Sequence, residues 1–324
     1  MEKPTKIIRK SIHTFLRNYH HFTSIATFLV FPVSASILLS QALPSSLPLL
    51  QSTHSRLQSL FDTAGFPPSS QFFSLLNIKL SQTIFSSIFT LPFTLSFLLL
   101  AKASIIQVLC CGPSSPCRHL SFYSLLHVYH PLLITHVCNC LVILSANASA
   151  FSLLFLTFNS LDVIGLSSPN ILLFLSTASA VLYSVVLANT LVICNLAIVV
   201  AGMENCSGYM AILKACVLMR GRAATALSLA LSTNLGFAAV EALFMYRVVR
   251  AYRQFHKFSA SVAWEAVLIT YIYSIFIVLD TVVGCIFYRS CKSGCPLDQE
   301  SRFESQIKLV EEDDFTNSKI IQLP

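Results

Sequence analysis

Residues 171–201 decide the fold and read Ile171-Leu-Leu-Phe-Leu-Ser-Thr-Ala-Ser-Ala-Val-Leu-Tyr-Ser-Val-Val-Leu-Ala-Asn-Thr-Leu-Val-Ile-Cys-Asn-Leu-Ala-Ile-Val-Val-Ala201. This stretch carries no charge, and as a helix it would be longer than the hydrocarbon core of a bilayer is thick. Crossing that core takes about 20 apolar residues in a helix. Comparable stretches recur along the chain, and alternation of period two, which is typical of strands, is absent. We therefore predict an all-α fold, a polytopic transmembrane helical bundle of about six spans, at residues 22–43, 82–109, 121–145, 170–201, 223–246 and 262–288.

Composition supports a membrane protein. The 324 residues are 55% hydrophobic and only 11% charged, whereas soluble domains contain about 25% charged residues. The formal charge of +7 comes from Lys and Arg near the predicted membrane edges, so the expected partner is the lipid bilayer, with anionic lipids at those edges, and no nucleic acid. The 11 cysteines lie mostly inside spans or beside predicted cytosolic edges, and we predict no disulfide framework.

Lys and Arg also predict orientation. With six crossings and a cytosolic N-terminus, roughly twelve basic residues fall inside and six outside, which favours cytosolic termini under the positive-inside rule. The predicted organisation is a basic cytosolic N-terminus over 1–21, a transmembrane domain over 22–288 with an interfacial connector at 203–222, and an acidic, disordered cytosolic tail over 289–324. The first span is interpreted as a retained signal anchor.

Two segments leave the count of crossings open. The strongly basic segment 247–257 falls outside in this arrangement, against the rule. The apolar run 150–166 is interpreted as an extracytoplasmic or re-entrant extension of the third span, but it leaves five or seven crossings as alternatives. In the first outside loop, we predict an interfacial helix that contains Leu50, Leu57, Leu60 and Phe61.

The segment 196–222 carries a resemblance. It reads Leu196-Ala-Ile-Val-Val-Ala-Gly-Met-Glu204, then Gly208-Tyr-Met-Ala211, then Leu218-Met-Arg-Gly221-Arg222. It resembles a plant family of uncharacterised six-span membrane proteins, which is similar in turn to the membrane domain of some bacterial glycerophosphodiester phosphodiesterases. No phosphodiesterase catalytic domain accompanies it, so the resemblance implies a fold and no activity. From the residues themselves, Ala211, Ala215 and Leu218 form one apolar face, while Lys214, Arg220 and Arg222 are expected to meet headgroups.

Two stripes of small residues predict a packing interface. Helices associate in membranes by close approach at such stripes. Because the fourth and fifth spans are consecutive, we predict that they pack as an antiparallel hairpin along Ser176, Ala180, Ser184 and Ala188 in one span and Ala226, Ala230, Asn234, Ala238 and Ala242 in the other.

Polar residues within the spans are candidate functional groups, because an ionisable side chain at mid-membrane costs at least about 2.5 to 3.5 kcal/mol. Residue counting places Lys102 and Asp280 roughly 10 to 12 Å deep from the cytosolic side, with His127 and Asn195 at similar depth. We predict a cytosol-facing polar pocket that collects these four. The alternative is that Lys102 extends to the headgroups and Asp280 meets Arg289.

Glu241 completes the candidate intramembrane polar site. It lies seven residues after Asn234 and is expected to face the bundle interior, where it suits a structural hydrogen bond or, alternatively, a proton relay. Glu265 is expected to pair with Arg253 or Lys257. A metal site is not predicted, because His136 falls about 180° from His127 around the helix.

Cysteines beside the predicted cytosolic edges, namely Cys110, Cys111, Cys291 and Cys295, are candidates for lipidation. The sequence contains no Gly-rich phosphate loop, nucleophile elbow or paired catalytic carboxylates, so we expect no cofactor and no enzyme activity. The favoured function is a non-enzymatic membrane organiser or interaction protein. The alternative is a transporter or channel for a small solute or ion that uses the polar pocket.

Overall fold

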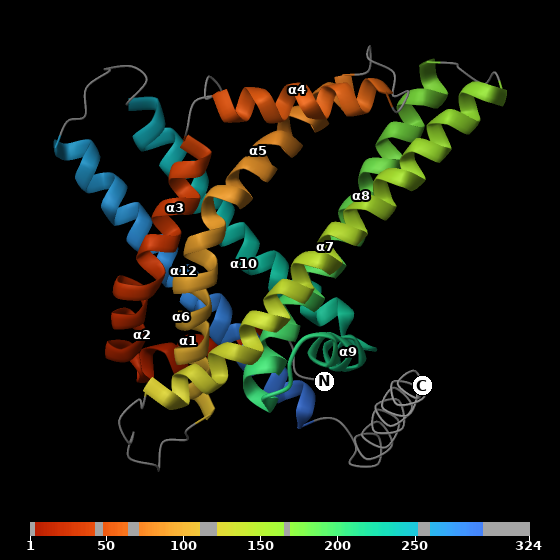
Figure 1. Ribbon diagram of the computed structural model, residues 1–324. Coiled ribbons are helices and arrows are strands. Elements are labelled where there is room, and N and C mark those ends of the chain that lie inside the picture. Colours follow the sequence, from red (N-terminus) through yellow and green to blue (C-terminus); the bar gives the residue numbers. More distant parts are fainter. Residues whose placement is uncertain are drawn as a thin grey trace, which may run out of the picture.

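The computed structural model describes residues 4–42, 48–63, 71–110, 122–164, 169–251 and 260–293, and within these ranges it contains helices and no strand. Figure 1 shows their arrangement. In chain order the elements are α1 (Pro4–Arg17), α2 (Tyr19–Ile25), η1 (Ala26–Val30), α3 (Phe31–Ala42), α4 (Pro48–Thr63), α5 (Gln71–Phe93), η2 (Thr94–Leu98), α6 (Leu99–Cys110), α7 (Phe122–Ile164), α8 (Pro169–Glu204), α9 (Tyr209–Met219), α10 (Ala223–Phe244), η3 (Met245–Val249) and α12 (Ala260–Lys292).

Among the described residues, six helical segments are long and apolar enough to cross a membrane, as predicted. They are Tyr19–Ala42, Leu80–Cys110, Leu125–Thr157, Thr177–Glu204, Ala223–Val249 and Ala260–Lys292. The fold is therefore a multi-pass helical bundle. The run 150–166 does not form a separate span, because residues up to Ile164 continue the long helix α7.

The bundle has two distinct ends (Figure 1). We call the end that carries α1, α9 and the last turns of α12 the α9 end, and the opposite end, which α4 crosses, the α4 end. The first helix and the last turns of α12 thus lie at the same end, as an even number of crossings requires. The segment that includes Arg247 and Arg250 lies at the α4 end, so the six-span count stands. The acidic tail lies outside the described residues.

Helix α12 is central, since α1, α3, α6, α8 and α10 all pack against it. The larger core cluster fills the α9 end with side chains such as Phe22, Leu99 and Val278, all at most 1% exposed. A second cluster around Leu38, Phe244 and Tyr273 lies nearer the α4 end. Exposed leucines and valines cover the outer surfaces of α7 and α8, as lipid contact requires.

Three of the spans contain a π-helical turn, at η1, η2 and η3. The turn η2 begins two residues after Pro92, which has no backbone N–H to donate and disturbs the regular hydrogen-bond pattern. The turns η1 and η2 also contact each other. Each such turn widens the helix locally and rotates the faces beyond it.

The predicted hairpin of small residues is wrong over most of its length. Helix α8 packs chiefly against α7 and α9, and α10 packs chiefly against α12. Ala226 is buried, but Asn234, Ala238 and Ala242 are exposed. Ala180, Ser184 and Ala188 instead line an open groove of about 410 Å³, to which α10 contributes Leu227. A stripe of small residues permits close approach but does not supply the partner.

The helix predicted in the first outside loop is present as α4, which lies across the α4 end (Figure 1). The connector predicted at 203–222 forms the turn after α8, helix α9 and the turn into α10. Ala211 and Ala215 are fully buried and Leu218 packs against the core, so the predicted apolar face of α9 is confirmed.

Candidate functional site

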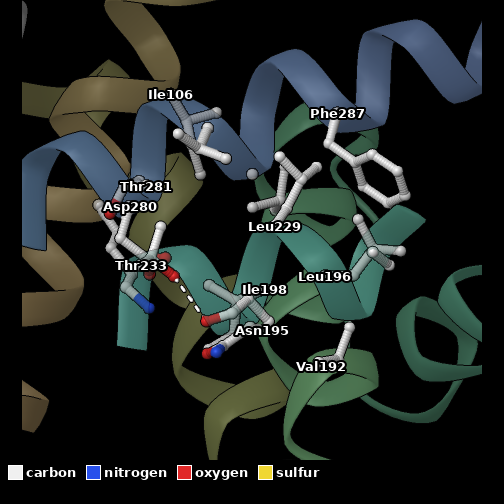
Figure 2. A pocket seen from close by; sticks show the side chains of 16 residues that line it. Ile106, Val192, Asn195, Leu196, Ile198, Leu229, Thr233, Asp280, Thr281 and Phe287 are labelled. Carbon is white, nitrogen blue, oxygen red and sulfur yellow. Dashed lines mark hydrogen bonds between the residues drawn. The ribbon is translucent and has the colours of Figure 1, made fainter. Parts of the chain in front are cut away.

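A small polar cavity lies between α6, α8, α10 and α12. Its volume is about 80 Å³, and its polar lining comprises Lys102, Asn195, Thr233, Asp280 and Thr281. Figure 2 shows Thr233 beside Asp280 and Thr281, with Leu196, Leu229 and Phe287 forming an apolar part of the wall. Four helices that are separated in sequence therefore supply one site, and three of its residues are those that residue counting placed at a common depth.

Lys102 of α6 is the unusual member of this lining. Its ammonium has no hydrogen bond, and no ion pair within 4.0 Å, to any described residue. It interacts electrostatically with Asp280 across the cavity. A cation left without a direct partner in a bundle interior is costly, and water, an ion or a polar solute in the cavity would lower that cost.

Asp280 of α12 has closer polar neighbours in the cavity than Lys102 has. The Thr233 side chain of α10 lies beside the Asp280 carboxyl, and the Thr233 hydroxyl donates to the Ala230 carbonyl at 3.1 Å. The alternative in which Asp280 meets Arg289 is wrong, because the Arg289 guanidinium donates to the Leu109 carbonyl at the end of α6. Lys102 and Asp280 thus face one cavity and do not turn toward the headgroups.

Asn195 of α8 marks the open side of the cavity. Its side chain is exposed and makes no hydrogen bond within the described chain. The groove along α8 reaches Asn189, one turn before Val192 of the cavity wall. The groove and the cavity are therefore neighbours along α8.

Two residues of the predicted site lie elsewhere. His127 of α7 is exposed and does not line the cavity. Residue counting gives the depth of a residue but not the side of the helix that faces inward. On α7, the histidine that interacts electrostatically with Lys102 is instead His136. Glu241 of α10 accepts a hydrogen bond from the Tyr273 hydroxyl at 2.9 Å, outside the cavity. Of the two roles considered for Glu241, a structural hydrogen bond and a proton relay, this contact fits the structural hydrogen bond.

Sequence reasoning missed Thr233 and Thr281. Neutral hydroxyls are common in membrane helices, where they usually donate to their own backbone, as Thr281 does to the Ile277 carbonyl at 3.0 Å. Only Thr233 could have been found from its spacing, because it lies one turn after Ala230 of the small-residue stripe that was predicted to face another helix.

A second polar cluster closes the α9 end around Glu204, the last residue of α8. Its carboxylate lies 2.9 Å from the Lys214 ammonium of α9 and 3.3 Å from the Lys292 ammonium of α12. The Tyr288 hydroxyl of α12 also donates to it. Lys214, which was expected at the headgroups, is thus engaged within the protein. These contacts tie three helices together and leave little capacity for a ligand.

The turn between α8 and α9 positions this cluster. Asn205 and Gly208 both have positive φ, and the Gly208 N–H donates to the Thr135 hydroxyl of α7 at 2.9 Å. Burial raises the pKa of the Cys206 thiol in the same turn, and the neighbouring Glu204 carboxylate adds to this while Lys214 opposes it.

The cysteines predicted as lipidation sites differ in their accessibility. Cys110 is exposed, and its Sγ lies 3.1 Å from the Met203 Sδ. Cys291 is 1% exposed, so an acyl group on it would require the end of α12 to rearrange. Cys111 and Cys295 lie outside the described residues.

Near the α4 end, Glu265 lies 4.0 Å from Arg247. The partners predicted for Glu265, Arg253 and Lys257, lie outside the described residues.

Comparison with known proteins identifies a family but no function. No curated protein and no solved structure matches the chain. A family model, described as a domain of unknown function (DUF8558), matches residues 4–298, which include all six spanning segments and every residue of the cavity lining. The chain therefore belongs to the DUF8558 family.

Proposed function

We propose that this multi-pass membrane protein binds and conducts a small polar solute or inorganic ion through the cavity between α6, α8, α10 and α12. The observation that carries the proposal is the Lys102 ammonium, which faces the cavity without a hydrogen bond or ion pair to any residue that the structure describes. The Asp280 carboxyl lies within electrostatic range, so the site offers both a donor and an acceptor for a bound species.

The size of the cavity limits the solute. Water occupies about 30 Å³ in the liquid, whereas pockets for organic ligands measure about 300 to 1,000 Å³. A cavity of about 80 Å³ therefore holds two or three waters, an inorganic ion or a molecule of a few heavy atoms. Sugars, nucleotides and lipid headgroups are too large for it in this conformation.

Flux in proteoliposomes tests the proposal. The panel comprises chloride, nitrate, sodium, potassium, protons and urea. We expect flux of at least one of these, with Lys102→Met and Asp280→Asn each lowering the rate at least about tenfold, because charged groups inside a membrane-spanning bundle interact strongly with a bound polar species. Glu241→Gln is the matched control, since it removes a carboxylate from a span but not from the cavity. Absence of flux across the panel, or flux that the cavity variants leave unchanged, would refute a conducting role.

A membrane organiser is the second candidate, and the hairpin of α7 and α8 favours it. These two helices pack chiefly against each other and lean away from the remaining spans (Figure 1), with large apolar side chains such as Leu144, Leu156 and Leu182 exposed. An organiser requires this surface and not the cavity. Lys102→Ala and Asp280→Asn would then leave localisation and recovery of bound partners unchanged.

We also propose that the α9 end faces the cytosol. Among described residues, basic side chains are concentrated there (Lys6, Arg9, Lys10, Arg17, Lys214, Arg220, Arg222, Arg289 and Lys292), whereas the α4 end has Arg56, Lys79, Arg247 and Arg250. The positive-inside rule favours this orientation. In sealed microsomes, an epitope inserted within residues 252–259 should resist added protease while a C-terminal epitope is digested. The reverse pattern would show that the α9 end faces away from the cytosol.

The resemblance to plant six-span proteins stays a prediction.

A further inference from the structure

Helix α1 lies at the α9 end (Figure 1), and the exposure of its side chains divides it into three different faces. Ile7, Ser11 and Phe15 are buried, and the helix packs against α12 and α10. At about 100° per residue, Ile12 and Leu16 lie on a strip about 100° to 140° to one side of Ser11. Both are exposed, at 44% and 61%. The bundle therefore covers only one of the two apolar strips of this helix.

The third face of α1 is basic. Lys6, Arg9, Lys10, His13 and Arg17 are all exposed, and their mean direction is about 140° from Ser11 on the side away from Ile12. Arg9, Lys10 and Arg17 form no ion pair within the described chain. The described acidic side chain at this end is Glu204, which is engaged with Lys214 and Lys292.

We propose that α1 is a binding surface for anionic phospholipids of the bilayer that surrounds the bundle. Ile12 and Leu16 enter the acyl boundary while Arg9, Lys10 and Arg17 contact phosphate and carboxylate headgroups. A helix with adjoining apolar and basic strips lies in the plane of the interface, and each nearby Lys or Arg adds electrostatic attraction toward an anionic leaflet. Tyr19, which is 48% exposed at the start of α2, is placed as an interfacial anchor at the end of this surface.

Charge complementarity selects anionic lipid as the occupant. A soluble acidic protein would satisfy the arginines, but it would leave Ile12 and Leu16 in water. A second copy of the chain would bring two basic faces together. Headgroups above acyl chains match both strips at once.

Fluorescence quenching in nanodiscs tests this surface in the full-length protein. Trp264 is the only tryptophan, so a Trp264→Phe background allows Leu16→Trp to report on α1 alone. Brominated chains are placed either on phosphatidylserine or on phosphatidylcholine at equal mole fraction. We expect quenching by the serine lipid to exceed that by the choline lipid at least about twofold. Replacing Arg9, Lys10 and Arg17 with Gln should bring the ratio close to one, as should 0.5 M salt, at which screening is strong.

Leu60→Trp in the same background is the control, because Leu60 of α4 is 64% exposed and the basic residue described on that helix is Arg56. Its ratio should be lower than that of Leu16→Trp. Absence of quenching by either lipid would show that α1 lies outside the bilayer. Equal quenching by the two lipids, or a high ratio that survives the triple replacement, would show that headgroup charge does not recruit lipid to α1. Each of these results overturns the proposal.

Discussion

The Lys214 ammonium lies 2.9 Å from the Glu204 carboxylate, and this ion pair joins the middle of α9 to the end of α8. Lys292 and Tyr288 bring α12 to the same carboxylate, so one acidic side chain serves three helices. The Glu204 side chain is 20% exposed, and solvent therefore screens these contacts only in part.

Glu204→Gln should lower the free energy of unfolding by about 1 to 2 kcal/mol, because it removes charge-assisted contacts to two ammonium groups and keeps an acceptor for Tyr288. Thermal unfolding of the purified protein measures the change. Glu265→Gln is the control, since its contact with Arg247 is 4.0 Å long and both side chains are largely exposed. Equal effects of the two variants would contradict a special role for the Glu204 cluster.

Gly208→Ala should destabilise the turn before α9 by about 2 kcal/mol or more, because φ 62° and ψ −129° suit only glycine. A methyl group there would also lie 3.2 Å from Ile134. Gly221→Ala is the comparison: Gly221 has φ 79° but nothing within 4 Å of the added carbon, so its cost should be smaller, about 1 kcal/mol. Chemical denaturation of both variants gives the comparison, and an equal loss of stability would contradict the larger cost expected at Gly208.

Ala230→Phe should destabilise the protein by about 1 to 3 kcal/mol, whereas Ala180→Phe should be tolerated. Ala230 lines the small cavity, where a phenyl ring overpacks the site, but Ala180 lines the open groove along α8. Thermal unfolding distinguishes the two variants. Comparable destabilisation by both variants would instead support the α8–α10 hairpin that the small-residue stripes predicted.

The Cys206 thiol should react slowly with alkylating reagents near neutral pH. Burial raises its pKa, so less of the reactive thiolate is present at a given pH than for an ordinary cysteine, and the rate should keep rising at higher pH. Mass spectrometry of the modified peptide across pH 6 to 10 measures this profile. A midpoint at or below that of a free cysteine would show that Lys214 outweighs burial.

The sequence was sufficient for properties that depend on distance along a helix. Lys102, Asn195 and Asp280 share a depth because helices rise 1.5 Å per residue, and counting alone predicted their common location. It was not sufficient for properties that depend on rotation about a helix. His127 has a suitable depth but lies on an outward side of α7, and the small residues of α10 beyond Asn234 turn away from α8. Rotation is set by packing partners and by π-helical turns, neither of which leaves a clear local pattern.

The length of α7 makes bilayer thickness a variable for this protein. Its 43 residues extend about 64 Å, roughly twice the hydrocarbon core that the other spans need to cross. A helix of that length must tilt, emerge from the surface or thicken the surrounding lipid, and each response has a modest cost that differs between thin and thick membranes. The thickness of the surrounding bilayer should therefore change the cost of accommodating α7 and the helix α8 that packs against it.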